Sequence, residues 1–290
     1  MATRQRQPGS SFKPFVYATA FKKGYTDKTM LFDVPTQFDT GCNSLGQPQS
    51  AGAKCYAPKN FDLKYRGPVT ARQALSNSLN IPSVEMLYLA GVEDSINTAE
   101  DLGLTTLKDR SRFGLSLVLG GGEVKLLEMT SAFGVFATEG VRHQPVSILK
   151  IEDNKGKVLE EYKDEPTQVL DTEIARLISN ILSDNVARTP VFGAHSSLFF
   201  PDRPIAAKTG TTNEFRDGWT LGYTPSLVTG VWTGNNDNSP IKQEPGVYTA
   251  APIWHEFMAQ AFEKLNLQPE SFTPPNIKTS TKPILNGQYL

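Results

Sequence analysis

The chain contains few of the side chains that commonly bind metals. Only 2 cysteines and 3 histidines occur among its 290 residues. Cys42 and Cys55 do not form a CxxC pair, and two cysteines alone are a weak metal signal. The histidines, which are His143, His195 and His255, follow no partner pattern. We therefore assign no chemistry to them and predict neither a bound metal nor a cofactor.

The sequence also lacks a long apolar run and an excess of charge of either sign. No run approaches the roughly 20 apolar residues that cross a bilayer. No signal peptide precedes the first predicted helix, so we expect any membrane anchor to lie outside this chain. A net charge of -1 and a pI near 6.3 argue against a nucleic-acid partner.

The residues that are present suit a globular domain. With 39% hydrophobic residues, a chain of this length can bury a substantial core. Helices are predicted near residues 10–22, 69–75, 84–89, 126–137, 171–182 and 252–265, and strands near 146–151, 219–223 and 227–232, with a turn at 224–226. After about Asn266 the sequence turns to Pro, Thr, Ser and Lys with little periodicity. We therefore predict one domain over residues 1–265 and a flexible tail or linker over residues 266–290.

Ser10 and Lys13 form the first motif of chemical interest. They open an apolar-periodic stretch that follows Pro8 and Gly9, which predicts a helix start and places both side chains on one face, about one turn apart. Pro14 fits only in the first turn, where its missing N–H is unpaired in any case. A serine at this place has its backbone N–H near the positive end of the helix dipole, where an oxyanion is stabilised.

The Ser-x-x-Lys spacing also occurs at Ser147 to Lys150 and at Ser239 to Lys242. The first pair lies in a predicted strand, where positions i and i+3 point to opposite faces. The second lies in a loop rich in Asn, which fixes no side-chain geometry. We therefore prefer Ser10.

Ser78-Leu79-Asn80 is the second motif. Ser-x-Asn also occurs at residues 95–97 and 183–185, and the latter ends a predicted helix as a polar terminus. We prefer Ser78 because it closes a predicted helical segment and Pro82 follows it, so the motif would lie on a turn between two helices. Taken singly, Ser78 as a helix cap and Asn80 as a turn former are the alternatives.

Lys208-Thr209-Gly210 is the third motif, and it follows a short apolar segment. As a strand, its small residues would let a peptide approach the backbone. Lys208 and the hydroxyls of the two threonines that follow the motif, Thr211 and Thr212, offer donors to a carboxylate. The alternative is an ordinary edge strand with an exposed lysine.

In this order the three motifs resemble those of the penicillin-binding protein and serine β-lactamase superfamily. Longer segments resemble the transpeptidase domain of bifunctional, class A penicillin-binding proteins over about residues 2–263. These segments are RQPGSSFKP (6–14), GGGEV (120–124), KTGTTN (208–213), RD (216–217), GYTP (222–225) and APIW (251–254).

The resemblance implies an α/β fold of the α+β type, with a central antiparallel sheet sandwiched by helices. In relatives, a helix and two strands of this sheet precede the nucleophile's helix, whereas only nine residues precede Ser10 here. The glycosyltransferase domain and membrane anchor are missing as well. We therefore expect a piece of a longer enzyme whose sheet has an open edge.

The resemblance also implies chemical roles. Ser10 would attack the carbonyl between the two terminal D-alanines of a peptidoglycan stem peptide, with Lys13 as general base. Because a free lysine titrates near 10.4, a neutral Lys13 at pH 7 costs about 4.6 kcal/mol unless burial and a second cation, Lys208, lower its pKa. Ser78 would relay a proton toward the leaving amine.

Substrate binding is implied for the remaining motif residues. Asn80 would bond the amide backbone of the substrate. Lys208, Thr209 and Thr211 would bind its terminal carboxylate, the acid group that β-lactams also present, with Gly210 between the two threonines. The backbone N–H groups of Ser10 and Thr211 would form the oxyanion hole.

Transfer and hydrolysis of the acyl group need different partners. A β-lactamase needs a carboxylate that activates water, and we can assign none, because Glu123 and Glu128 are expected to be caps or surface charges. We therefore expect a second stem peptide as the amine acceptor. The alternatives are hydrolysis, as in a D,D-carboxypeptidase or β-lactamase, and a non-catalytic β-lactam sensor or inactive fragment.

The resemblance implies work at the outer face of the cytoplasmic membrane. In that setting a disulfide between Cys42 and Cys55 would close a polar loop and stabilise the protein by about 3 kcal/mol. Two free thiols are the alternative.

Overall fold

A three-stranded antiparallel sheet forms the centre of the computed structural model, which describes residues 2–241, 244–276 and 279–289. The strands are β9 (Ala206–Thr211), β10 (Asp217–Tyr223) and β11 (Val228–Gly234), in the order β11-β10-β9. The turn between β10 and β11 falls at residues 224–226, as predicted. Among the described residues, β9 and β11 each pair with β10 alone, so both are edge strands.

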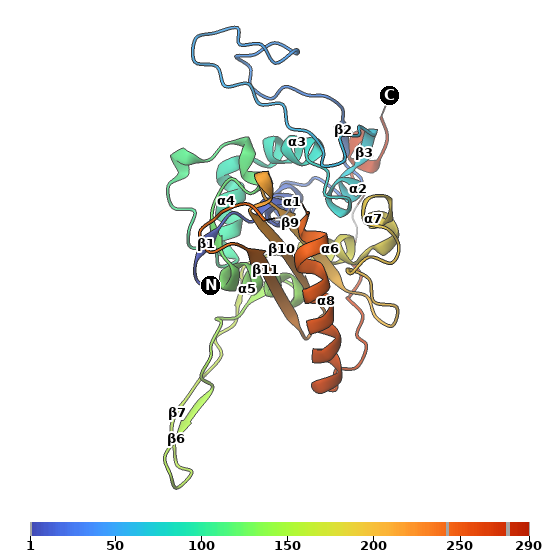
Figure 1. Ribbon diagram of the computed structural model, residues 1–290. Helices are drawn as coiled ribbons and strands as arrows, with labels where there is room; N and C mark the ends of the chain where they lie inside the picture. The colour runs from blue at the N-terminus through green and yellow to red at the C-terminus, as the bar shows by residue number, and fades with distance from the viewer. Residues whose placement is uncertain (1, 242–243, 277–278, 290) are drawn as a thin grey trace.

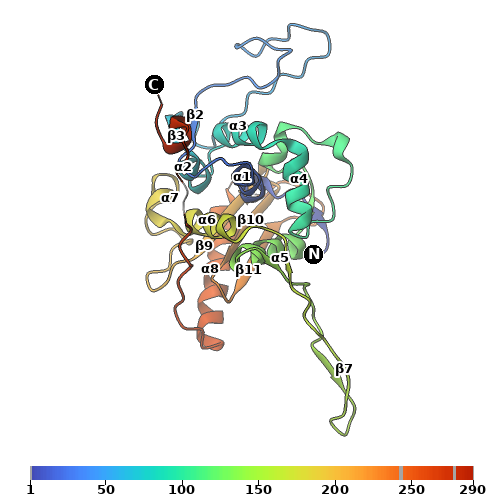
Figure 2. The ribbon, with the colours of Figure 1, turned by 180° about the vertical axis from the view of Figure 1, so that it is seen from behind.

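Helices cover both faces of this sheet. Helix α8 (Gly246–Lys264) packs on one face, and α5 (Leu126–Ala137) and α6 (Thr172–Ser183) pack on the other (Figures 1 and 2). The apolar side chains of α8, with Trp254 fully buried, form a smaller core cluster. The main core lies on the opposite face. The predicted fold class is confirmed.

Helix α1 (Lys13–Lys22) lies in the main core against α3 (Ile81–Ala90), α4 (Val92–Asp101) and α6. Every side chain of α1 except Lys22 is buried, as expected of a helix that is surrounded on all sides. A short 3-10 turn, η1 (Gly9–Phe12), leads into it, and Pro14 lies in its first turn. The predicted start near Ser10 is confirmed.

Helix α2 (Ala71–Ser76) begins later than predicted, because Gly67–Thr70 form strand β3, which pairs with β2 (Met30–Asp33). Thr70 then caps the helix in a capping box with Gln73. Helices α4 and α7 (Asn185–Phe192) were not predicted. Asp184 ends α6 and caps α7 through the N–H of Ala187, so the competing Ser-Asp-Asn motif has a structural role.

The remaining elements are short. The strand pairs are β1 (Gln5–Arg6) with β4 (Val124–Lys125), β5 (Val141–Arg142) with β8 (Thr167–Gln168), and β6 (Lys150–Glu152) with β7 (Val158–Glu161), and the 3-10 turns are η2 (Arg110–Arg112), η3 (Leu115–Leu119), η4 (Asn213–Phe215) and η5 (Pro283–Asn286).

The β6–β7 hairpin projects from the body (Figure 1). Its first strand is shorter than the predicted 146–151, because a lone hairpin has no core on which to bury one face. Ile148 and Leu149 are accordingly 63% and 68% exposed.

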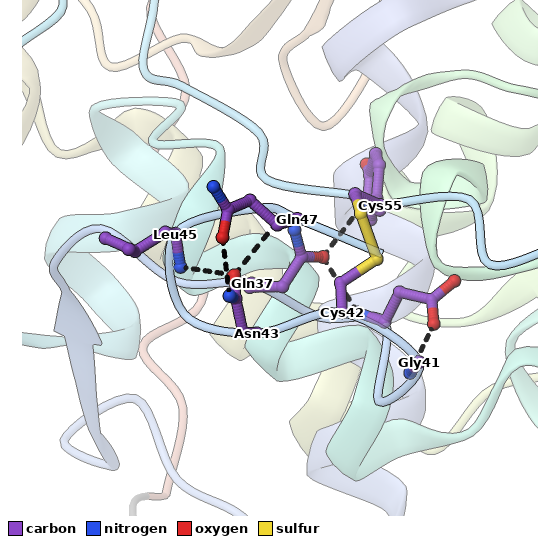
Figure 3. Close-up of a disulfide and its surroundings, with 9 residues drawn as sticks. Gln37, Gly41, Cys42, Asn43, Leu45, Gln47 and Cys55 are labelled. Atoms are coloured by element: carbon purple, nitrogen blue, oxygen red, sulfur yellow. Dashed lines mark hydrogen bonds between the residues drawn. A yellow bond between two sulfur atoms is a disulfide. The ribbon is translucent and has the colours of Figure 1, made fainter. Parts of the chain in front are cut away.

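The connection between β2 and β3 also projects, and a disulfide ties it together. Cys42 and Cys55 are bonded, with 5.6 Å between their Cα atoms (Figure 3). Gln37 Oε1 accepts the backbone N–H of Tyr56 at 2.7 Å, and Asn43 Oδ1 accepts those of Leu45 and Gln47 at 3.0 and 2.9 Å. Of the two alternatives for these cysteines, the structure contains the bonded one.

The segment after α8 runs back along the body. Phe272 lies edge-to-face against Tyr223, with ring centroids 5.6 Å apart, and the hydroxyl of Thr26 donates to the carbonyl of Leu285. The domain boundary at residue 265 stays a prediction. No helix within the described ranges is both long and apolar enough to cross a membrane.

Candidate active site

The three motifs meet at a cleft of about 150 Å³. Its walls come from η1, from the turn between α2 and α3, from the end of β9, from α7 and from the start of α8. The lining residues are Ser10, Phe61, Asn77, Ser78, Asn80, Val191, Phe192, Thr209, Thr211, Pro245, Val247 and Tyr248.

Glycines let η1 approach the end of β9 closely. A β-carbon at Gly210 would lie 2.1 Å from the carbonyl oxygen of Pro8, and one at Gly9 would lie 2.5 Å from that of Thr211. Gly120, with a φ of +88°, approaches Gly9 in the same way from η3. These contacts bring Ser10 beside Thr211. The protein itself thus fills the space beside Gly210. The absence of a side chain at this position allows η1 to pack on β9, in addition to the predicted approach of a peptide to the backbone.

Lys13 is fully buried beneath the cleft. Its Nζ donates to the carbonyl oxygens of Ser78 and Leu79 at 2.7 and 3.0 Å and to Asn80 Oδ1 at 2.9 Å. Burial holds the pKa of Lys13 well below its usual value, and the charge of Lys208 lowers this pKa further. Both causes were predicted.

Ser78 links the two lysines. Its backbone is left-handed, with a φ of +56°, and it lies between α2 and α3 as predicted. Its Oγ accepts a hydrogen bond from Lys208 Nζ at 2.7 Å and lies 3.5 Å from Lys13 Nζ. The hydroxyl therefore bridges both amines.

Lys208 is 3% exposed, so the alternative of an edge strand with an exposed lysine is wrong on the second point. Its Nζ also donates to the carbonyl oxygen of Thr209 at 2.9 Å. Burial lowers the pKa of Lys208 to about 7, and the charge of Arg188 contributes to this shift.

Arg188 was missed by sequence analysis. It comes from α7, is 3% exposed and donates from Nη2 to the carbonyl oxygen of Ile205 at 3.2 Å. Its own pKa is lowered to about 10 by burial. A single arginine in a segment that matches no motif gives no sequence signal.

The predicted binding residues lie along both walls. Asn80 donates from Nδ2 to the carbonyl oxygen of Lys59 at 2.8 Å, while its Oδ1 accepts from Lys13. Thr209 and Thr211 line the opposite wall, and the Thr211 hydroxyl accepts the N–H of Gly246 at 2.8 Å. Ser10, Ser78, Asn80, Thr209 and Thr211 thus line one cleft, with both lysines bonded to Ser78.

The apolar part of the lining was also missed. Phe61 comes from the segment after the disulfide, and its ring lies edge-to-face against Phe215, with centroids 6.3 Å apart. Val191, Val247 and Tyr248 come from helices far apart in the sequence. No local pattern marks these side chains, because only the fold brings them together.

The two glutamates named above are held elsewhere. Glu128 accepts from the hydroxyl of Thr105 at 2.7 Å and from Lys125 Nζ at 2.6 Å, and Glu123 pairs with Arg112 at 3.2 Å. Of the competing Ser-x-x-Lys pairs, Lys242 lies outside the described residues. The described part of the chain contains no group of three or more His, Cys, Asp and Glu side chains that could hold a metal ion.

Comparisons with known proteins agree with this geometry. The family described as penicillin binding protein transpeptidase domain matches residues 1–259. Penicillin-binding protein 1A of Aquifex aeolicus is 34% identical over 279 residues, which are 96% of this chain and 36% of that protein. The corresponding protein of Neisseria flavescens is 32% identical over 270 residues, which are 91% and 32% of the two chains. The chain therefore spans about a third of the length of these curated relatives.

Solved structures give the same picture. Penicillin-binding protein 1A from Haemophilus influenzae has a TM-score of 0.80 at 27% identity, with 99% of this chain and 47% of that chain covered. PonA1 from Mycobacterium tuberculosis, in complex with penicillin V, has a TM-score of 0.78 at 25% identity, with 95% and 74% covered.

Proposed function

The chain belongs to the penicillin-binding protein transpeptidase family, and from this premise we propose that it is a serine D,D-transpeptidase. It cross-links peptidoglycan stem peptides through an acyl-enzyme on Ser10, and β-lactams acylate the same serine. The observation that carries the proposal is the hydroxyl of Ser78 bridging two buried lysines at a cleft that Ser10 lines.

Acylation begins with the transfer of the Ser10 hydroxyl proton to Lys13. The lowered pKa of Lys13 supports this role, because only a neutral amine offers a lone pair. A neutral Lys13 has two N–H donors and so keeps two of its three hydrogen bonds, while the lone pair turns toward Ser10. Ser10 Oγ then bonds to the carbonyl carbon, and the negative oxygen is held by the backbone N–H groups of Ser10 and Thr211.

The tetrahedral intermediate collapses when its C–N bond breaks and D-alanine leaves. Its nitrogen takes the proton from Lys13 through the Ser78 hydroxyl, a route supported by the contacts of Ser78 Oγ with both lysines. The amine of a second stem peptide then attacks the ester and gives a proton to the base, and Ser10 Oγ leaves with a proton.

Substrate binding falls to the two walls of the cleft. Lys208, Thr209 and Thr211 bind the terminal carboxylate, and Asn80 bonds the peptide backbone. The bond from Gly246 N–H to the Thr211 hydroxyl supports this assignment, because it leaves the hydroxyl proton to be donated. Gly210 contributes through its backbone.

We also propose that the domain works outside the cytoplasm, at the outer face of the cytoplasmic membrane. The Cys42–Cys55 disulfide supports an oxidising compartment. The greater length of the relatives leaves room for the glycosyltransferase domain and membrane anchor that full-length enzymes of this kind carry.

Intact-mass measurement after incubation with a penicillin tests the acylation. We expect one stable adduct on the parent protein, none on Ser10→Ala, and full labelling of Ser147→Ala, which alters a serine with the same spacing to a lysine. An adduct on Ser10→Ala would refute the assignment, and release of the adduct within seconds would indicate a β-lactamase.

A second measurement separates an enzyme from a sensor. A stem peptide with an amine acceptor should give cross-linked product with the parent and none with Ser10→Ala. Acylation without cross-linked product would favour the non-catalytic alternative, and release of D-alanine alone would favour a carboxypeptidase.

A further inference from the structure

Asn60 is a buried asparagine that takes no part in the proposed acylation chemistry. It follows the disulfide loop and is 3% exposed. Its Oδ1 accepts the backbone N–H of Asn80 at 2.8 Å. Its Nδ2 donates to Asp33 Oδ1 at 2.6 Å and to the carbonyl oxygen of Lys64 at 2.8 Å. Both hydrogens of the side-chain amide are therefore used, which fixes its orientation.

The residue before it completes a clamp on Asn80. The carbonyl oxygen of Lys59 accepts from Asn80 Nδ2 at 2.8 Å. Because the nitrogen of that amide is held there, its oxygen must face the other way, and it accepts from Lys13 Nζ at 2.9 Å. Lys59 and Asn60 thus hold both the backbone and the side chain of Asn80.

Asp33 anchors the clamp in the body of the protein. It lies on β2 and is fully buried. Its Oδ2 accepts the N–H of Arg66 at 3.1 Å and lies 3.6 Å from the Arg66 guanidinium. Asp62 pairs with the same guanidinium at 2.6 Å, and Glu85 accepts the N–H of Phe32, the residue before Asp33, at 2.9 Å. Lys59 and Lys64, whose carbonyl oxygens accept from Asn80 and Asn60, also carry charge.

We propose that Asn60 is a positioning residue for acylation. Asp33 holds the side chain of Asn60, which bonds to the backbone of Asn80, and Asn80 in turn fixes the position of the Lys13 amine. The inference rests on the proposed function, because it assigns Asn60 a part in aiming the base that acylates Ser10. An acceptor bonded to an ammonium favours the charged form, so weakening of the Asn80 contact should lower the pKa of Lys13 further, beyond the lowering by burial and by Lys208.

The first test is the second-order acylation rate constant with a penicillin, measured across pH. Asn60→Ala removes the acceptor of Asn80 N–H, and we expect the plateau rate to fall at least tenfold. The acidic limb of the pH–rate profile, where the rate falls as Lys13 becomes protonated, should move to lower pH. The reason is that the loosened Asn80 oxygen stabilises the Lys13 ammonium less. A variant that is merely less stable would contain less active protein but would keep the limb unmoved.

Asn43→Ala is the matched control. It makes the same substitution in the disulfide loop, where the side chain bonds, within the described part of the chain, to Leu45 and Gln47 alone (Figure 3). We expect it to keep both the plateau and the limb of the parent protein.

A second test exchanges the asparagine and the aspartate of the Asn60–Asp33 pair, so that a polar side chain of the same size remains at each position. Asn60→Asp places a carboxylate against Asp33, and two carboxylates at this distance share a proton only in acid. Its rate relative to the parent should therefore rise as the pH falls from 8 to 5. In the double variant with Asp33→Asn the amide donates in the reverse direction, so the relative rate should recover at least fivefold at pH 8 and lose its pH dependence.

The outcomes separate the two claims. If the parent forms an adduct, and Asn60→Ala has a plateau acylation rate within twofold of the parent's and the same acidic limb, the inference alone is overturned. A parent that forms no adduct would overturn the proposed function and this inference with it. If Asn60→Ala does not fold, the swap decides: a double variant no faster than Asn60→Asp at pH 8 contradicts the proposal.

Discussion

The floor of the cleft and the β6–β7 hairpin place their side chains in opposite ways. In the floor, Lys13 and Lys208 are buried and their pKa values are lowered. In the hairpin, Leu149 and Leu159 are 68% and 62% exposed. Both regions depart from the usual rule of apolar inside and charged outside.

The two departures differ in cost. Burial of a lysine is unfavourable unless its donors are satisfied, and Lys13 keeps three acceptors within 3.0 Å. Exposure of a leucine on a projecting hairpin removes no packing from the core. The rest of the fold therefore maintains the floor against a free-energy cost, whereas we expect the hairpin to contribute little to the stability of the fold.

The largest expected effect tests how tightly the floor is built. Gly210→Ala places a β-carbon 2.1 Å from the Pro8 carbonyl oxygen, a backbone atom that cannot move aside cheaply. We expect a loss of about 4 kcal/mol in the free energy of unfolding and no detectable acylation, measured by urea denaturation and intact mass.

Gly134→Ala is the control for that change. Its β-carbon would meet Val228 Cγ1 at 3.6 Å, an ordinary contact, in the middle of α5. We expect a gain of up to about 1 kcal/mol. Equal effects of the two substitutions would contradict the close approach of η1 to β9.

The disulfide loop lies between these two cases, because it projects like the hairpin yet continues through Lys59 and Asn60 to Phe61, which lines the cleft. Replacing Cys42 and Cys55 together with alanine should lower the free energy of unfolding by about 3 kcal/mol, through the entropy of the unfolded chain. Limited proteolysis should then cut first within residues 34–58, and acylation should slow a few-fold. Cleavage at the parent's rate would show that the loop is ordered without its disulfide.

The burial of Lys208 predicts a pH dependence of stability. Its pKa is about 7 in the folded protein and near 10.5 when unfolded, so the unfolded chain binds more protons between these values. The free energy of unfolding therefore rises with pH across this window. Between pH 7 and 9 the parent should gain about 2 kcal/mol relative to Lys208→Met. Parallel urea-denaturation midpoints of the two proteins would contradict the lowered pKa.

The smallest effect is expected in the hairpin. Leu149→Lys and Leu159→Lys together should change the free energy of unfolding by no more than about 0.5 kcal/mol and leave the acylation rate unchanged. Ile178→Ala, at a fully buried position on α6, should cost about 3 kcal/mol in the same denaturation assay. A loss above about 1 kcal/mol from the leucine pair would mean that the hairpin packs on the body.

Much of the arrangement around the motifs was predictable from the sequence because local rules act there. Pro14 is compatible with a helix only in its first turn, which places Ser10 just before α1, in the turn η1 that leads into it. Pro82 likewise marks the start of α3, so Ser78 falls on the turn before it. The segment around Lys208, which follows a short apolar run, was interpreted as a strand, and it forms β9.

The parts that were not predicted depend on distant pairing. Gly67–Thr70 join β2 as a strand, although the segment alone suggested the beginning of a helix. Arg188 and Phe61 gain their positions only when α7 and the disulfide loop reach the cleft. The spacing of Cys42 and Cys55 left two states open, because whether a disulfide forms depends on how the loop folds.

The left-handed backbone of Ser78 restricts which alcohol can serve at that position. Glycine, asparagine and aspartate adopt this conformation most readily, and a residue with a branched β-carbon is strongly disfavoured there. Threonine, the other aliphatic alcohol among the amino acids, is branched at this carbon. A primary alcohol therefore suits the bridge between the two amines far better than a secondary one, so an exchange that looks conservative would strain the turn itself.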